Sequence, residues 1–170
     1  MTPPRRFTIW PWLIIFLMVG SLLWMLNRLS TQVRHADGCE ENLRKIHHIL
    51  TLYELEHGRL PSLEMFPDDP TGEGASLPLL LRTYGMDPSL AVCPAASPLI
   101  RDHGLSYLWN TALNEGSLMN RLEPVWVLVD IQALNERTRG PHFGSYHILY
   151  SDGRVERSYH PPSTLPVQVD

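Results

Sequence analysis

Cysteine is scarce in this chain, which has only Cys39 and Cys93 and no Cys-x-x-Cys pair. It also lacks a glycine-rich phosphate loop and a Gly-x-Ser-x-Gly elbow, so neither nucleotide binding nor serine hydrolase chemistry has sequence support. Lys and Arg number 14 against 18 Asp and Glu. Because nucleic-acid binding requires basic side chains, this acidic balance argues against a nucleic-acid partner. The length of 170 residues corresponds to one domain.

Charge is absent from residues 7–26, which read FTIWPWLIIFLMVGSLLWML. A helix of about twenty apolar residues matches a hydrocarbon core of about 30 Å. Trp10, Trp12 and Trp24 lie towards its ends, where amphipathic rings favour the membrane interface. The sequence therefore predicts a membrane-spanning helix over 7–26. A cleaved signal peptide is the alternative, but its apolar region is shorter and precedes an Ala-x-Ala-like site, which is missing here.

Basic residues on the two sides of this segment indicate its orientation. Arg5 and Arg6, with the amino terminus, slightly outweigh Arg28 and Arg34. By the positive-inside rule, residues 1–6 are cytoplasmic and the remainder is periplasmic or otherwise extracytoplasmic. The expected location is the inner (cytoplasmic) membrane, crossed once.

A second helix is predicted over about 38–57. One apolar face repeats at spacings of three and four residues. It comprises Cys39, Leu43, Ile46, Leu50, Tyr53 and His57. Asp37 is a plausible N-cap, and Gly58 and Pro61 end the helix. It either continues from the membrane helix or follows a bend at Asp37-Gly38.

The later part of the chain has β patterning. Short strands are expected at 91–94, 105–109 and 125–130, with a short helix at 77–84. Two further runs flank Asp152-Gly153, which predicts a hairpin over about 144–159. Residues 161–170 read as an irregular tail. The expected class is α+β: a membrane helix, then an amphipathic helix packed on a small antiparallel sheet.

Several motifs occur in a definite order between residues 39 and 156. They are the helix pattern CxxNLRxI…Y…GxLP from Cys39 to Pro61, Val92-Cys93-Pro94, the SYxxN segment from Ser106 to Asn110, and His142 followed after nine residues by Asp152-Gly153. In this combination the chain resembles type IV pilin-like proteins. It is most similar to the type II secretion pseudopilin-like proteins abundant in Planctomycetes and Verrucomicrobia.

The amino terminus departs from the pattern of that family. A prepilin signal has Gly before the cleavage point, then Phe-Thr-Leu-x-Glu. In this chain Arg6 stands at the Gly position, Phe7 begins the matching run, and Pro11 stands at the Glu position. The resemblance therefore implies a degenerate signal, in which neither peptidase processing nor the usual charge pairing between subunits is expected.

The resemblance implies a pilin-like ectodomain over 27–160 and a non-enzymatic, membrane-anchored subunit of a secretion or pilus-type assembly. Its partners would be the membrane and other pilin-like or secretion-system subunits, with no small-molecule substrate. The alternative is a non-polymerising, single-pass periplasmic binding or scaffold module with the same fold. A membrane-tethered hydrolase using His142 or Asp152 is the least favoured hypothesis.

The two cysteines have two interpretations. In an extracytoplasmic domain, Cys39 and Cys93 would form a disulfide closing a loop of about 55 residues, worth about 4 kcal/mol in the chain-entropy model. The other interpretation is two free, buried thiols. Zinc is not expected, because no second ligand pair is recognised to complete a four-ligand site.

The remaining candidate ligands are histidines and acids. His142 and His147 are five residues apart, which places them on opposite faces of a strand. We therefore interpret His142, Asp152 and Gly153 as a hairpin signature, with His142 bonding the turn, and expect no catalytic residue. Asp68, Asp69 and Glu73 form an acidic loop that could bind Ca²⁺, although a solvated loop is favoured and no cofactor is expected.

Overall fold

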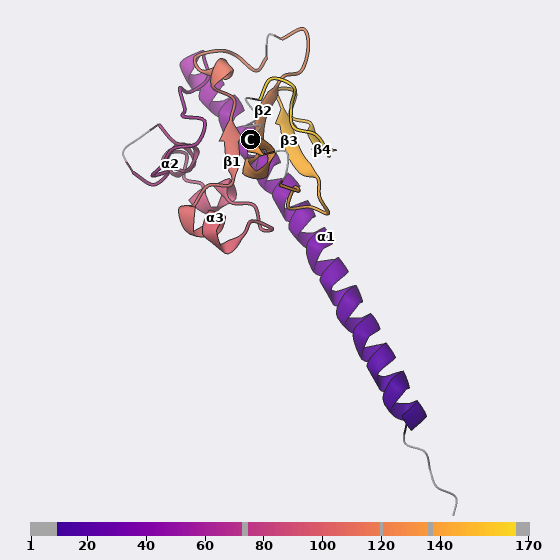
Figure 1. Cartoon of the computed structure of the whole chain (residues 1–170). Helices are drawn as coiled ribbons and strands as arrows, with labels where there is room; N and C mark the ends of the chain where they lie inside the picture. The colour runs from indigo at the N-terminus through magenta and orange to yellow at the C-terminus, as the bar shows by residue number, and fades with distance from the viewer. Residues whose placement is uncertain (1–9, 73–74, 120, 136–137, 166–170) are drawn as a thin grey trace, which may run out of the picture.

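The computed structural model describes residues 10–72, 75–119, 121–135 and 138–165. The fold is α+β, as the sequence predicts, with one long helix and a small antiparallel sheet (Figure 1). The helices are α1 (Trp10–His57), α2 (Leu77–Thr83) and α3 (Pro98–His103). The strands are β1 (Tyr107–Trp109), β2 (Trp126–Asp130), β3 (Tyr146–Tyr150) and β4 (Val155–Ser158). Three short 3₁₀ turns, η1 (Pro88–Ala91), η2 (Thr111–Leu113) and η3 (Ile131–Leu134), connect them.

Helix α1 is a single rod of 48 residues, which corresponds to about 72 Å. Residues 12–30 are exposed throughout, and burial against the rest of the chain begins at Ala36. Figure 1 shows the amino-terminal half of the helix projecting away from the domain. The helix is continuous through Asp37 and Gly38, so the amphipathic segment extends the apolar segment without a bend.

The buried face of α1 follows the predicted spacing. Cys39, Leu43, Ile46 and Leu50 are fully buried, whereas Tyr53 is half-buried. His57 is exposed and stacks on the Tyr53 ring at 4.1 Å between centroids. The packing face therefore ends about one turn before the helix does.

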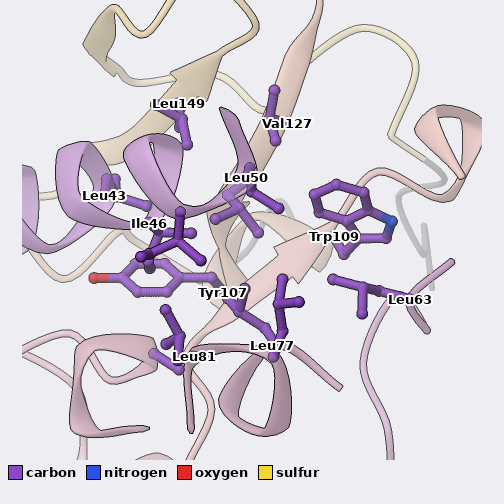
Figure 2. Packing of buried hydrophobic residues seen from close by; sticks show 14 of the residues in the cluster. Leu43, Ile46, Leu50, Leu63, Leu77, Leu81, Tyr107, Trp109, Val127 and Leu149 are labelled. Atoms are coloured by element: carbon purple, nitrogen blue, oxygen red, sulfur yellow. The ribbon is translucent and has the colours of Figure 1, made fainter. Parts of the chain in front are cut away.

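The four strands form one antiparallel sheet in the order β1-β2-β3-β4. Side chains alternate along a strand, so the sheet has two faces. Nearly every residue of β1, β2 and β3 is buried, so both faces are covered there. On the face towards α1, Leu43, Ile46 and Leu50 lie against Tyr107, Trp109, Val127 and Leu149 (Figure 2). A second cluster contains Leu108, Trp126, Val129, Tyr146, Ile148 and Leu165.

The carboxyl-terminal hairpin is formed by β3 and β4. The Gly153 amide donates to the Tyr150 carbonyl at 2.9 Å, and Gly153 has φ +83°. The carboxylate of Asp152 accepts from the Arg154 amide at 3.0 Å. Of the two turn residues, only Gly153 has a positive φ.

The strand predicted at 91–94 is wrong. This stretch begins in the 3₁₀ turn η1, where Asp87 accepts from the Ser89 amide at 2.8 Å and Pro88 starts the turn. Proline is favoured in a first helical turn because its φ is already fixed near the helical value. The capped turn therefore takes precedence over the local apolar pattern.

Candidate functional site

A group of buried side chains lies where α1 enters the domain, and we call it the Cys–His–Asp cluster. It consists of Cys39, Cys93, Asp130 and His142. They come from α1, the segment after η1, the end of β2 and the stretch before β3. One Sγ, nitrogen or carboxylate oxygen from each residue lies within 4.8 Å of all the others. The fold thus brings together four residues that are distant in sequence.

Short contacts join the members of the cluster. The Sγ of Cys93 lies 3.2 Å from Nε2 of His142. The Sγ of Cys39 lies 3.9 Å from Oδ1 of Asp130. The same 3.9 Å separates His142 Nε2 from Asp130 Oδ2, and both of these side chains are fully buried.

Further polar groups surround the cluster. The hydroxyl of Tyr107 lies 3.1 Å from Cys39 Sγ, and either atom can donate. The His147 amide donates to Asp130 Oδ2 at 2.7 Å, and the Ala95 amide donates to Cys93 Sγ at 3.4 Å. The two amides are suited to stabilise a negative charge on their acceptors.

Burial determines the protonation of the cluster. It raises the pKa of Asp130 to about 7, against the lowering effect of the His147 amide bond. It lowers the pKa of His142 to about 3, with a smaller contribution from His147. Burial also raises the pKa of the Cys39 thiol. The contact with Cys93 and the nearby Asp130 carboxylate raise this pKa further, each by less than burial does. In each case the low-dielectric surroundings favour the neutral form.

Two imidazole nitrogens in this region have no hydrogen-bond partner among the residues that the structure describes. They are Nδ1 of His142 and Nδ1 of His147, and both are buried. Buried polar atoms are nearly always satisfied in folded proteins. The cluster is therefore rich in ligand atoms and poor in strong hydrogen bonds.

The predicted disulfide between Cys39 and Cys93 is not formed, and both cysteines are free and buried. Each sulfur instead contacts other polar groups, Tyr107 and Asp130 for Cys39, and His142 for Cys93. The second interpretation, two free buried thiols, describes the structure.

The prediction that His142 and His147 lie on opposite faces is also wrong. Their ring centroids are 4.2 Å apart. The alternation rule does not apply between them, because His142 precedes β3 and pairs with Ser145 in an isolated bridge. The His142 carbonyl accepts from the Ser145 amide at 3.0 Å, within the turn at 142–145. This is not the predicted bond to the Asp152-Gly153 turn, and the His142 side chain instead extends into the cluster.

The acidic loop does not gather its candidates around a common point in the described residues. Oδ1 of Asp69 accepts from the Thr71 amide at 3.0 Å, the Thr71 hydroxyl at 2.9 Å and the Gly72 amide at 3.0 Å. These bonds lower the pKa of Asp69, and the two bonds from Thr71 have the largest effect. Asp68 is exposed, and Glu73 lies outside the described residues. Calcium binding here stays a prediction.

The structure describes only part of the segment in which the resemblance predicts a degenerate prepilin signal. Arg6 and Phe7 lie outside the described residues, and Pro11 belongs to the first turn of α1.

Of the cluster members, sequence reasoning missed Asp130. The sequence signal for Asp130 was its place as an acid at the end of the apolar run 125–130. Residues Trp126–Asp130 of this run form β2, and every one of them is buried.

A second feature with functional meaning is the exposed apolar surface of α1. By length and composition α1 can cross a membrane, and its most apolar window is unburied in the chain. Its exposed large side chains include Trp10, Trp12, Phe16, Leu17, Met18, Leu22, Leu23, Trp24 and Met25. An unbroken apolar surface of this size requires a cover of lipid or of other helices.

Comparisons of the chain with protein-family models, with curated proteins and with solved structures return no match.

Proposed function

We propose that this chain is a non-enzymatic, membrane-anchored pilin-like subunit of a secretion or pilus-type assembly. The observation that carries the proposal is the division of α1 into two halves. Residues 12–30 expose apolar side chains, and the same helix then buries Cys39, Leu43, Ile46 and Leu50 against the domain. A continuous helix holds the domain at a fixed distance from the membrane and transmits forces between them.

In the proposed role, the amino-terminal half of α1 packs against lipid and against equivalent helices of other subunits. In this role the function depends on burial and helix packing, and no bond chemistry is required.

Photo-crosslinking in native membranes tests the proposal. A photoreactive phenylalanine analogue replaces Leu22, which is 56% exposed in the apolar half of α1. The expected products are crosslinks to other small membrane proteins with apolar amino-terminal helices. The matched control carries the analogue at Leu99, which is 82% exposed in α3, and gives a different set of products. Crosslinks from position 22 to lipid alone contradict assembly through this helix.

The non-polymerising module remains the second candidate because of Pro11. Proline carries no charge, so it cannot replace the Glu that the resemblance places at this position. On this alternative the chain is anchored in the same way but contacts one partner through its domain. Crosslinks from position 99 but not from position 22 favour it.

A further inference from the structure

The Cys–His–Asp cluster contains the donor atoms of a transition-metal site. Two sulfurs, one imidazole nitrogen and one carboxylate oxygen converge within 4.8 Å, and all four residues are buried. Thiolate and imidazole ligands select zinc and related ions, whereas calcium and magnesium prefer oxygen alone. The chemistry of the donors therefore points to a borderline-soft divalent ion.

The spacing of these atoms is close to that of a tetrahedral site. With zinc–sulfur bonds of about 2.3 Å and zinc–nitrogen or zinc–oxygen bonds of about 2.0–2.2 Å, neighbouring ligand atoms lie about 3.3–3.8 Å apart. The separations here are 3.2 Å from Cys93 Sγ to His142 Nε2, 3.9 Å from Cys39 Sγ to Asp130 Oδ1 and 3.9 Å from His142 Nε2 to Asp130 Oδ2, and one donor atom from each residue lies within 4.8 Å of all the others. Binding an ion requires the donor atoms to move together by up to about 1 Å.

The surroundings of the two sulfurs and of the carboxylate resemble those of metal ligands, whereas Nδ1 of His142 has no partner among the described residues. The Tyr107 hydroxyl and the Ala95 amide lie at hydrogen-bond distance from the two sulfurs, at 3.1 and 3.4 Å. The His147 amide orients Asp130 by donating at 2.7 Å to Oδ2, the oxygen that lies 3.9 Å from His142 Nε2. Such partners fix the ligand atoms and stabilise thiolate and carboxylate charge.

A cation would give the buried carboxylate a charged partner. Among the described residues, fully buried Asp130 receives one strong hydrogen bond, from the His147 amide, and its contact with the Cys39 thiol is long at 3.9 Å. Buried carboxylates are normally paired with a positive group or a metal ion. A divalent ion offsets the charge of the carboxylate and of both thiolates, leaving a net charge of about −1.

We propose that Cys39, Cys93, Asp130 and His142 bind one zinc ion. Four protein ligands close the coordination sphere, so the site is structural and has no open position for a substrate. It ties α1 to the segment after η1, to β2 and to the approach to β3, at the point where the helix leaves the domain. This inference is independent of the proposed assembly role.

The test uses the full chain, extracted in detergent and purified under reducing conditions with a tag free of histidine. The protein is stripped with a chelator, incubated with Zn²⁺ and desalted, and bound metal is counted by mass spectrometry. We expect about one zinc per chain in the wild type. Co²⁺ in place of zinc should give the visible bands of a tetrahedral site and a thiolate charge-transfer band.

Variants then assign the ligands. Cys39→Ser and His142→Gln should bind zinc at least 100-fold more weakly, since loss of a supporting group alone costs about 10–100-fold. Tyr107→Phe, which removes only the hydroxyl beside Cys39, should retain one zinc with about 10-fold weaker affinity. His48→Gln is the control, because His48 is an exposed histidine on the same helix as Cys39 but outside the cluster, and this variant should retain one zinc per chain.

Three results overturn the proposal. The first is a folded, reduced wild-type chain that takes up no zinc, a result that requires no variant to fold. The second is a cobalt complex without the thiolate band. The third is recovery of a Cys39–Cys93 disulfide from native membranes, shown by the absence of free thiols after denaturation without reductant.

Discussion

The sulfur of Cys93 lies 3.2 Å from Nε2 of His142, across 49 residues of chain. This contact joins the segment after η1 to the approach to β3, and Cys39 and Asp130 complete the group from α1 and β2. Polar side chains therefore meet at the end of the domain where α1 enters it, whereas apolar side chains form the core on the face of the sheet towards α1.

Zinc should stabilise the full chain in detergent. A ligand that binds only the folded state contributes about 2.7 kcal/mol when its free concentration is 100 times its Kd. For a chain of this size, that corresponds to a rise in Tm of about 5–10 °C. Thermal unfolding followed by circular dichroism, with and without Zn²⁺, measures the shift. Cys93→Ser provides the control, and an equal shift in that variant would show that zinc acts elsewhere.

Gly140→Ala should destabilise the domain by about 2–3 kcal/mol and weaken zinc binding as well. A Cβ at this position would lie 1.9 Å from the Ser145 carbonyl oxygen, within the turn that positions His142. Chemical denaturation monitored by tryptophan fluorescence measures the loss. Gly20→Ala is the control, since its Cβ meets no atom within 4 Å. If the Gly140→Ala variant were as stable as the wild type, the turn could not have the close approach of Gly140 to Ser145 that the structure shows.

Glu54→Ala should cost about 1–3 kcal/mol, because it leaves buried donors without an acceptor. The carboxylate of Glu54 is 8% exposed and accepts from the Ser117 hydroxyl and from the Leu118 amide, the latter at 2.9 Å. It therefore fixes the end of α1 to the loop after η2. The same denaturation experiment measures this change.

The control for Glu54 is Glu41→Ala, on the same helix. Glu41 forms an exposed ion pair with Lys45 at 3.4 Å. Exposed pairs of this kind contribute little, so we expect a change below about 0.5 kcal/mol. Equal effects at the two positions would contradict the anchoring role of Glu54.

The proposed orientation predicts the behaviour of carboxyl-terminal reporters. Alkaline phosphatase fused after Asp170 should be active, because this enzyme folds only after export. Green fluorescent protein fused at the same position should be dark, because it does not become fluorescent when it is exported unfolded. The basis is the small excess of positive charge before the apolar segment. A fluorescent green fluorescent protein fusion together with an inactive alkaline phosphatase fusion would show the opposite orientation.

The two segments of the long helix were predictable because their signals are local and periodic, but their continuity through Asp37 and Gly38 was left open by the sequence. The spacing from Cys39 to Leu50 identifies the buried face, and Gly58, with φ +73°, ends the helix as expected. The hairpin was predictable for the same reason, since the Asp152-Gly153 turn and its flanking strands are adjacent in sequence.

The cluster was not predictable, because it depends on the order of the strands and on the direction of single side chains. Asp130 ends an apolar run and reads as a strand boundary, and His142 reads as a turn residue. Antiparallel pairing of β2 with both neighbours brings Asp130 opposite Tyr107 and beside His147. A two-cysteine chain suggests a disulfide, and only the fold shows that Asp130 and His142 gather beside the two free thiols.

The size of the complex extracted from native membranes in mild detergent tests the central claim most directly. We predict that the chain migrates with other membrane subunits, at a mass well above that of one 19.4 kDa chain in its micelle. Polar substitutions on the exposed face of α1, such as Leu22→Asn, should shift it to the monomer position. A wild-type chain found only as a monomer under these conditions would contradict the assembly role.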